Sequence, residues 1–516
     1  MAEPLVLTFD MGTQSARAVL VNPQGDILFK VQKIYEPPYV SRAPGWAEQR
    51  AEFYWESILE LSRRLKAESG DAWGAVTAVT CTTIRDTCVC LDRDLKPLRE
   101  IILWIDDRPL DNLPPLPAAV QAALKLAMVS DKLDLQRRKS HCNWIALNQR
   151  DLWERTCKYV MFSTWLNYKF TGNLADSDAG VIGHVPYDNK LRSWMKKNDF
   201  RRMVFDLSDD KLFDIVPPGT VIGPVTPAAA EETGIPAGVP FVATGSDKGC
   251  ETLGLSCLAE HKAALSFGTT ATVQLSTRRW FEPTPFMPSY AAIVPGYYNP
   301  EIQINRGYWL LSWFKREFAA KEVVQAGERG VSAERLLDER LKEIPPGCDG
   351  LILQPYFTPA FSMPHAKGVV IGFSDVHTRI HLYRAIIEGL NFALLEGLRT
   401  MEKRGGLKVT EIYAAGGGSQ SAEVCRITAS QFGLPVYRTQ TYEAGGIGAS
   451  LCAFVSRGVF SSYEEGLARM VHVRDEFLPD EGEHEIYGEL YERIFTKLFT
   501  RLSPLYQEIN QILRKK

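Results

Sequence analysis

Two stretches half a chain apart share one pattern of apolar and polar positions. Residues 5–21 form an apolar run, a short polar turn that contains Gly12, and a second apolar run. Residues 263–275 repeat this order around Gly268. Apolar runs on either side of a short glycine-containing turn predict β-hairpins. We therefore expect a duplicated fold with one hairpin in each half of the chain.

Strand and helix patterns follow one another through the rest of the chain. Short apolar runs predict strands at residues 26–31, 76–80, 88–92, 101–103, 241–244, 351–355, 368–372 and 411–415. Apolar residues at helical spacing predict helices at residues 50–66, 144–154, 158–170, 249–254, 305–318, 333–341, 381–401, 423–432 and 487–512. This alternation of strands and helices predicts α/β domains.

Both hairpin turns have the chemistry of an anion site. Glycine lets a tight turn direct its backbone N–H groups into one small volume, and the hydroxyls of Thr13, Thr269 and Thr270 add donors. The first turn also contains Asp10, and a carboxylate beside an anion suggests a bridging cation such as Mg²⁺. Two phosphate-binding hairpins predict a nucleotide, although either hairpin alone is more typical of an ordinary turn.

Polar residues at strand ends suggest a site for hydroxyl groups. Arg85 and Asp86 follow the strand at 76–80, where ligands bind in open α/β sheets. Their guanidinium and carboxylate suit hydroxyl groups, and the alternative is a solvated surface ion pair. Trp104 and Asp106 follow the next apolar run. The indole offers a flat face to a sugar, or else packs into the core, while Asp106 and Arg108 hold either hydroxyls or each other.

Two further strand ends carry candidate groups. Asp247 stands between the strand at 241–244 and a helix, where it either accepts a hydroxyl proton or caps the helix. The strand at 411–415 runs into Gly416, Gly417 and Gly418, which precede another helix. Three glycines form either a flexible turn or a platform that a flat base or ribose can approach.

Composition favours small-molecule chemistry. The 516 residues are enough for two or three domains, and 59 basic against 62 acidic residues leave a net charge of −3. The chain therefore lacks the excess of positive charge that would favour binding to nucleic acid or to an anionic membrane. We expect a cytoplasmic protein, because the N-terminus has no signal-peptide pattern and no apolar run approaches ~20 residues. The ten cysteines lack metal-ligand spacing and are expected to be small buried side chains rather than zinc ligands.

Together these features resemble the FGGY carbohydrate kinases, which belong to the wider sugar kinase, Hsp70 and actin superfamily. The resemblance extends from Asp10 to about residue 455. Residues 368–389, GVVIGFSDVHTRIHLYRAIIEG, are similar to the C-terminal signature of the family. Residues 157–172, CKYVMFSTWLNYKFTG, are similar to its N-terminal signature, and LWIDDRP matches its Trp-x-Asp-x-Arg motif.

The resemblance implies an α/β fold of duplicated ribonuclease H-like, actin-like ATPase domains with a cleft between them. Residues 1–252 would carry the sugar site and the first phosphate hairpin, and residues 253–516 the adenosine site and the second hairpin. It implies ATP and Mg²⁺ as cofactors, with Asp10 on the metal and Asp247 as catalytic base. The implied ATP-binding residues are Gly12, Thr13, Gln14, Gly268, Thr269, Thr270, Gly416, Gly417 and Gly418. The residues expected to bind the sugar, from their chemistry at strand ends and from the implied role of Asp247, are Arg85, Asp86, Trp104, Asp106 and Asp247.

We therefore predict an enzyme that transfers phosphate from ATP to a primary hydroxyl of a sugar or polyol. One alternative is an actin- or Hsp70-like ATPase, which does not explain Arg85, Asp86 and Trp104. A second is a sugar-binding regulator without activity, against which an intact Asp10 and Asp247 argue.

Departures from the family pattern leave the substrate open. Asp86 stands where glycerol kinases carry Glu, and Lys248 where they carry Gln. The Met-His-Gly of xylulose kinases is absent near Arg85. The oligomeric state is also open, with a homodimer as one option.

Overall fold

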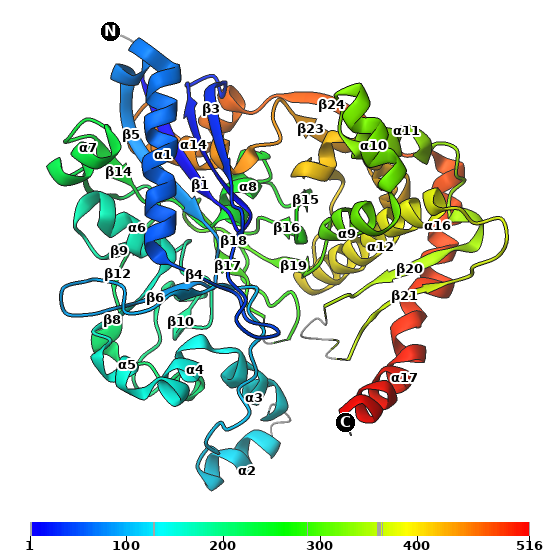
Figure 1. Ribbon diagram of the computed structural model, residues 1–516, viewed down its shortest axis with the longest axis horizontal. Helices are drawn as coiled ribbons and strands as arrows, with labels where there is room; N and C mark the ends of the chain where they lie inside the picture. The colour runs from blue at the N-terminus through cyan, green and yellow to red at the C-terminus, as the bar shows by residue number, and fades with distance from the viewer. Residues whose placement is uncertain (1–2, 127–129, 286, 359–362, 364, 515–516) are drawn as a thin grey trace. The chain divides into compact units, whose positions relative to one another are not determined.

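The chain divides into two compact units (Figure 1). The computed structural model describes residues 3–126, 130–285, 287–358, 363 and 365–514. Unit 1 comprises Met1–Gly254, Tyr290–Tyr297 and Gly445–Val471, and unit 2 comprises Leu255–Ser289, Tyr298–Ala444 and His472–Lys516. The predicted assignment of a sugar-binding and an adenosine-binding domain, divided between residues 252 and 253, stays a prediction.

The core of unit 1 is a six-stranded sheet. Its spatial order is β13 (Val221–Pro224), β14 (Pro240–Val242), β5 (Val76–Thr83), β1 (Leu5–Met11), β2 (Ser15–Val21) and β3 (Ile27–Ile34). The strands β1, β2 and β3 form an antiparallel meander, which confirms the first predicted hairpin. Strand β5 runs parallel to both β1 and β14, and β13 is antiparallel to β14. The β1 strand is buried along nearly its whole length, as expected for a strand covered on both faces.

Helix α1 (Ala51–Ser69) covers part of the sheet of unit 1, and the unit also contains a separate four-stranded sheet. This helix packs on β2 and β3, burying Tyr54, Ile58, Leu61 and Leu65 at helical spacing (Figure 1). The smaller sheet has the order β4 (Glu48–Gln49), β7 (Ile101–Ile102), β6 (Cys88–Leu91) and β8 (Lys158–Met161). The other helices are α2 (Ala118–Leu126), α3 (Ser130–Lys139), α4 (His141–Asn148), α5 (Arg150–Arg155), α6 (Phe162–Thr171), α7 (Pro227–Thr233), α8 (Asp247–Gly254), α14 (Ala444–Ser456) and α15 (Tyr463–Met470). The other strands are β9 (Ala175–Ser177), β10 (Tyr187–Asp188), β11 (Ser193–Trp194), β12 (Asp214–Val216) and β17 (Tyr290–Ala291).

Unit 2 repeats the sheet of unit 1 strand for strand. Its order is β19 (Glu301–Ile304), β16 (Ala271–Leu275), β15 (Lys262–Phe267), β22 (Glu411–Ala415), β23 (Val436–Thr439) and β24 (Val473–Phe477). The β19, β16 and β15 strands form an antiparallel meander, β15 runs parallel to β22 and β22 to β23, and β24 is antiparallel to β23. These are the directions found in unit 1. The predicted second hairpin and the predicted duplication are therefore confirmed.

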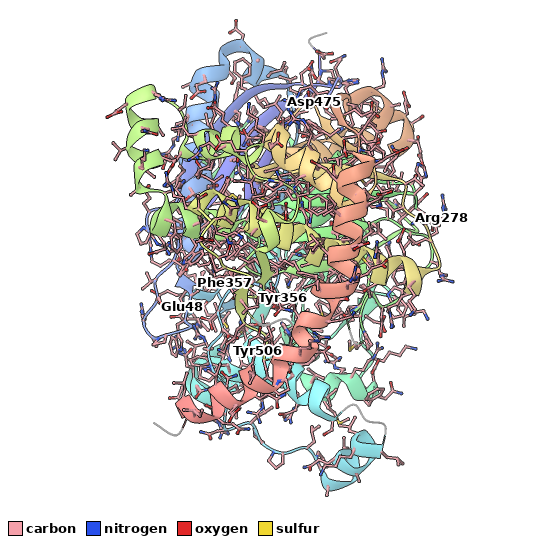
Figure 2. The ribbon with its side chains drawn as sticks, turned by 90° about the vertical axis from the view of Figure 1, so that its right-hand side faces the viewer. Glu48, Arg278, Tyr356, Phe357, Asp475 and Tyr506 are labelled. Atoms are coloured by element: carbon pink, nitrogen blue, oxygen red, sulfur yellow. The ribbon has the colours of Figure 1, made fainter. Side chains whose placement is uncertain are left out.

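A long helix organises the rest of unit 2. Helix α12 (Arg379–Gly405) begins in a capping box of Thr378 and His381 and packs on β16, β19 and β20 (Ile352–Pro355). Strand β21 (Gly368–Ile371) pairs with β20, and Tyr506 of α17 (Thr496–Arg514) donates to Gln354, two residues before Tyr356 (Figure 2). The remaining elements are β18 (Tyr298–Asn299), α9 (Trp309–Phe318), α10 (Ala320–Arg329), α11 (Ala333–Leu341), α13 (Ala422–Phe432) and α16 (Glu481–Leu490).

Four predicted helices differ from the structure. The helix expected at 487–512 is interrupted by a π-helical turn at Tyr491–Phe495, which separates α16 from α17. The helix expected at 158–170 begins at Phe162, because residues 158–161 pair with β6 as strand β8 and sheet burial overrides their helical spacing. The helix expected at 144–154 is broken at Gln149, whose φ of −135° and ψ of 54° are not helical. The helix expected from residue 305 begins at Trp309, because β19 pairs with β16 as far as Ile304.

The cysteines agree with the sequence-based expectation of small buried side chains. All ten cysteines are free thiols, and nine of them are buried. Among the helices formed by the described residues, none combines the length and the apolar character that a membrane crossing requires.

Candidate active site

The first hairpin turn connects the end of β1 to the start of β2 in unit 1. The N–H of Gly12 donates to the carbonyl of Ser15 over 3.1 Å, and a Cβ at Gly12 would lie only 3.0 Å from that same oxygen. Glycine therefore suits the tight turn. The indole N–H of Trp104 donates to the hydroxyl of Thr13 over 2.8 Å. The structure thus brings a predicted sugar-binding residue into contact with a predicted phosphate-turn residue.

Asp10 lies on β1 directly opposite Arg17 on β2. The guanidinium Nη1 of Arg17 is 3.2 Å from Oδ2 of Asp10, and the carboxylate side chain is 22% exposed. The described part of the chain contains no group of three or more His, Cys, Asp and Glu side chains arranged to hold a metal. A single accessible carboxylate beside a phosphate turn nevertheless fits Mg²⁺, which typically takes one or two carboxylates and completes its shell with water and phosphate.

Asp86 is clamped by a segment almost a hundred residues away. Its backbone has a left-handed φ of 48°, and its N–H donates to the carbonyl of Ile182 over 2.8 Å. The backbone N–H of His184 donates to Oδ1 over 2.8 Å, and Nδ1 of His184 lies 2.7 Å from Oδ2. A Cβ at Gly183 would lie 2.7 Å from Oδ1 of Asp86, so only glycine permits this close approach. Burial acts to raise the pKa of Asp86, but the charge and hydrogen bonds of His184 outweigh it and hold that pKa below its ordinary value.

Arg85 faces the candidate base. Its Nε is 3.6 Å from Oδ1 of Asp247, and its guanidinium lies 5.5 Å from the ring centroid of Tyr290. The Arg85 side chain is only 14% exposed. A solvated surface ion pair, the alternative prediction for Arg85 and Asp86, is therefore wrong, because Arg85 is largely buried against Asp247 while Asp86 is held by His184.

Asp247 is the first residue of α8, and it does not cap that helix. Ser246 supplies the cap, since its hydroxyl accepts the N–H of Gly249 over 3.3 Å. Oδ1 of Asp247 accepts only the neighbouring N–H of Lys248 among the hydrogen bonds described, over 2.8 Å, and the side chain is 31% exposed. Burial raises the pKa of Asp247 above its ordinary value, although the charges of Arg85 and Lys248 oppose the rise. The carboxylate is thus partly accessible and more basic than a free aspartate.

Asp106 belongs to a buried ion-pair cluster. Its side chain is 0% exposed, and Oδ1 is 2.8 Å from Nε of Arg108. Arg108 also pairs with Glu48 over 2.9 Å, and its guanidinium lies 4.0 Å from the ring centroid of Trp46 and 4.4 Å from that of Trp144. Of the two predicted alternatives, the structure shows Asp106 and Arg108 holding each other. Contact between Asp106 and a substrate remains a prediction.

Three residues of this region were not found from the sequence. His184, His141 and Tyr290 lie on separate segments, and an isolated His or Tyr carries no motif. Burial lowers the pKa of His141 to about 4, although the charge of Asp86 opposes the shift, so this imidazole is neutral near pH 7. We call the set of Arg85, Asp86, His184, Asp247 and Tyr290 the acceptor cluster.

Unit 2 brings the second hairpin turn to the start of α9. The N–H of Tyr308 donates to the carbonyl of Gly268 over 3.0 Å, and the hydroxyl of Thr270 donates to the carbonyl of Asn305 over 3.3 Å. The turn that contains Thr269 is therefore fixed by the segment after β19. Its remaining N–H and hydroxyl groups are the candidate phosphate donors.

The three glycines after β22 pack against this same turn. Gly416 has a φ of +82°, and a Cβ there would lie 2.9 Å from the carbonyl carbon of Phe267. A Cβ at Gly418 would lie 2.3 Å from the ring of Tyr308, whereas a Cβ at Gly417 would meet nothing within 4 Å. The first and third glycines are thus required by close packing, and the middle one faces open space. The turn is therefore closely packed rather than loose, and its role as a platform for a base or ribose stays a prediction.

Comparison with known families agrees with these features. The model of the FGGY family of carbohydrate kinases, N-terminal domain, matches residues 5–254, and the model of its C-terminal domain matches residues 263–457. The chain belongs to the FGGY family of carbohydrate kinases. It is therefore a phosphotransferase with an alcohol group as acceptor, and membership of this kinase family implies the use of ATP.

Similar FGGY proteins extend over nearly the whole chain. An uncharacterized sugar kinase of Escherichia coli (strain K12), YgcE, is 26% identical over 490 residues, covering 94% of this chain and 92% of that protein. A xylulose kinase of Bacillus subtilis (strain 168) is 24% identical over 488 residues, covering 92% of each. The crystal structure of xylulose kinase from Rhodospirillum rubrum superposes with a TM-score of 0.80 at 23% identity, covering 98% of this chain and 100% of that one. This likeness confirms the predicted fold class of duplicated actin-like ATPase domains.

Proposed function

We propose that this FGGY kinase transfers the terminal phosphoryl group of ATP to a primary hydroxyl of a sugar or polyol, with Asp247 as the general base. The observation that carries the proposal is the state of Asp247. Its carboxylate is partly exposed, is not used as a helix cap, has a raised pKa and faces Arg85. A carboxylate that only stabilised α8 would be expected to cap the helix, whereas Asp247 leaves that role to Ser246 and stays partly accessible.

The other residues position the reactants. Phosphoryl transfer depends on alignment and charge neutralisation more than on covalent chemistry by the protein. Mg²⁺ would be held through Asp10 and supplies charge neutralisation at the phosphates when bound. The phosphates would be bound by the turns that contain Gly12, Thr13 and Gln14 and that contain Gly268, Thr269 and Thr270, and adenosine by Gly416, Gly417 and Gly418.

The acceptor cluster and Trp104 would bind the substrate hydroxyls. Arg85 and Asp86 offer a donor fork and an acceptor, and the indole of Trp104 offers an apolar face. A pentulose is the first acceptor to test, because two of the similar proteins are named xylulose kinases. Hexuloses, polyols and aldonates complete the panel.

Acceptor-stimulated release of ADP tests this function. A coupled ADP assay should give a low rate with ATP alone and a much higher rate with one member of the panel. An acceptor-independent rate would instead favour an actin- or Hsp70-like ATPase. Binding of a sugar without ADP release would favour a regulator that lacks catalysis.

The Arg85→Ala variant is expected to raise the KM of the acceptor roughly tenfold to a hundredfold and to leave the KM of ATP unchanged. A buried hydroxyl that loses a charged partner costs ~1–3 kcal/mol. Because the charge of Arg85 lowers the pKa of Asp247, the acid limb of the pH–rate profile should also move to higher pH. Arg50→Ala is the control, since Arg50 is an exposed arginine of the same unit that pairs with Glu56. A rise in the KM of ATP alone would refute this role of Arg85.

His184 is expected to act through Asp86. His184→Ala removes the ring donor to Oδ2 and should raise the acceptor KM roughly tenfold, whereas His184→Asn keeps a side-chain N–H near the position of Nδ1 and should restore most of the affinity. In a double-mutant cycle with Asp86→Ala, the second substitution should add little. Fully additive effects on the acceptor KM would show that His184 does not work through Asp86.

A further inference from the structure

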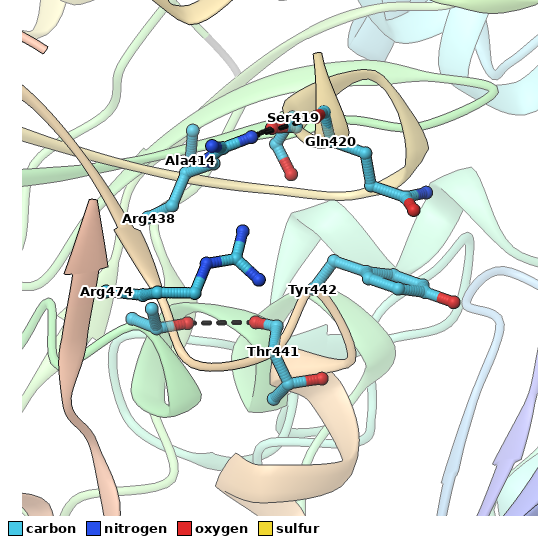
Figure 3. Close-up of a pocket in the computed structure, with 8 residues that line it drawn as sticks. Ala414, Ser419, Gln420, Arg438, Thr441, Tyr442 and Arg474 are labelled. Atoms are coloured by element: carbon cyan, nitrogen blue, oxygen red, sulfur yellow. Dashed lines mark hydrogen bonds between the residues drawn. The ribbon is translucent and has the colours of Figure 1, made fainter. Parts of the chain in front are cut away.

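Arg438 links strand β23, which neighbours the edge strand β24 of the unit 2 sheet, to the glycine turn. It lies on β23 and is paired in register with Asp475 on β24. Its Nη1 donates to the carbonyls of Ser419 over 2.9 Å and Gln420 over 2.8 Å (Figure 3). These two carbonyls end the 3₁₀ turn Gly417–Gln420, where carbonyl groups lack partners within the turn itself.

The rest of the Arg438 side chain is anchored. Nε and Nη2 lie 2.9 Å and 2.8 Å from Oδ2 of Asp475, and the guanidinium is 4.9 Å from the ring centroid of Phe477. Arg474 also donates to Oδ2 of Asp475 over 2.8 Å. The hydrogen bond from Arg474 and the charges of both arginines lower the pKa of Asp475 despite its partial desolvation, so the carboxylate stays ionised near pH 7. Arg438 is therefore fixed by Asp475 of strand β24 while its Nη1 binds the carbonyls of the turn.

The contacts of Arg438 with the two carbonyls, which we call the clamp, can fix the shape of the glycine turn. Glycine residues have no side chains that restrict the backbone, so the shape of the turn depends on external contacts. Ser419 contributes one, since its hydroxyl donates to the carbonyl of Gly416 over 2.8 Å. Nη1 of Arg438 contributes two more, and it is held rigidly because the planar guanidinium binds Asp475 through its other two nitrogens.

We infer that Arg438 is a positioning residue, which holds the Gly416–Gly418 platform in the shape that binds the adenosine part of ATP. The inference rests on the proposed function, from which the platform role comes. The clamp forms one wall of a pocket of about 240 Å³, whose other walls include Thr441, Tyr442 and Arg474 (Figure 3). Arg438 acts on the backbone of the turn and needs no contact with the nucleotide.

Two matched variants separate the clamp from the charge of the pocket. Arg438→Gln and Arg474→Gln each remove one positive charge beside Asp475, but among the contacts described only Arg438 reaches the carbonyls of the turn. Calorimetric titration with ADP, without acceptor, should show about tenfold weaker binding for Arg438→Gln and less than about twofold change for Arg474→Gln. The KM of ATP should rise by the same factor, with the acceptor KM unchanged. Amide hydrogen exchange at residues 416–421 should accelerate only in Arg438→Gln.

Equal losses in both variants would overturn the inference, because they would trace the effect to charge. Unchanged ADP binding and exchange in a folded Arg438→Gln would overturn it as well. If Arg438→Gln does not fold, Asp475→Asn serves instead: it weakens the anchor and should lower ADP affinity severalfold, and unchanged affinity would contradict the clamp. A wild-type protein that binds ADP but phosphorylates no acceptor would remove the proposed function and leave this inference standing.

Discussion

The Asp247→Asn variant is expected to lose about 10²- to 10⁴-fold in turnover, the range typical of removing a general base. Asparagine keeps the size and the acceptor oxygen that receives the N–H of Lys248, so α8 should keep its start. It cannot accept the proton of the attacking hydroxyl. ADP binding should be unchanged, because Asp247 is proposed to act on the acceptor and not on the nucleotide.

The pH dependence gives a second test of Asp247. The base must be ionised, so activity should fall as the pH drops through its pKa, which burial places above the ordinary value of 3.8. The variant should lose this acid limb together with its rate. Glu251→Gln is the matched control, because Glu251 lies on the same helix and pairs with Lys248 over 3.1 Å. Near wild-type turnover in Asp247→Asn would remove Asp247 from the mechanism.

Most of the fold was predictable because its information is local. Each hairpin is predicted by one short stretch, in which apolar runs flank a glycine turn, and both hairpins have antiparallel strands in the structure. The strand that ends at Ala415 and the helix at 333–341 were predicted with the bounds observed. The failure at β8 has a different cause. Its partner β6 lies about seventy residues earlier, and no local pattern states that pairing.

The candidate site was less predictable, since its contacts join distant segments. Asp247 could be identified from its position after a strand. That it does not cap α8 could not be predicted, because this depends on Ser246 accepting the N–H of Gly249. Asp86 could be proposed as a hydroxyl ligand, yet its clamp by His184 spans 98 positions in sequence. Asp106 was proposed to contact the sugar because its motif includes charged residues. The burial that leaves Asp106 paired with Arg108 depends on Trp46 and Trp144, which contact Arg108 only in the folded chain.

The end of the C-terminal signature also has a physical explanation. Glu388 and Arg384 lie one turn apart on α12 with side chains 4% and 3% exposed, joined over 2.7 Å. The hydroxyl of Tyr487 donates to Glu388 over 2.7 Å and is itself contacted by Arg384 over 2.9 Å. The neighbouring Gly389 allows α12 to approach β20, since a Cβ there would lie 2.3 Å from the carbonyl oxygen of Leu353. The Glu-Gly pair therefore stabilises the packing of unit 2: Glu388 compensates the buried charge of Arg384, and Gly389 lets α12 approach β20 closely.

The Glu388→Ala variant is expected to lower the free energy of unfolding by about 3–5 kcal/mol, because removing one partner leaves the buried guanidinium of Arg384 without its counter-charge. Tyr487→Phe removes one hydrogen-bonding group and should cost only ~1 kcal/mol. Replacing both charges, in Arg384→Met with Glu388→Leu, should recover much of the loss, since an apolar pair of similar volume leaves no buried charge unpaired. Urea denaturation of the intact chain measures the three differences from the midpoints and slopes of the transition. A loss below about 1 kcal/mol in Glu388→Ala would contradict the account, because it would mean that water or another group already compensates Arg384.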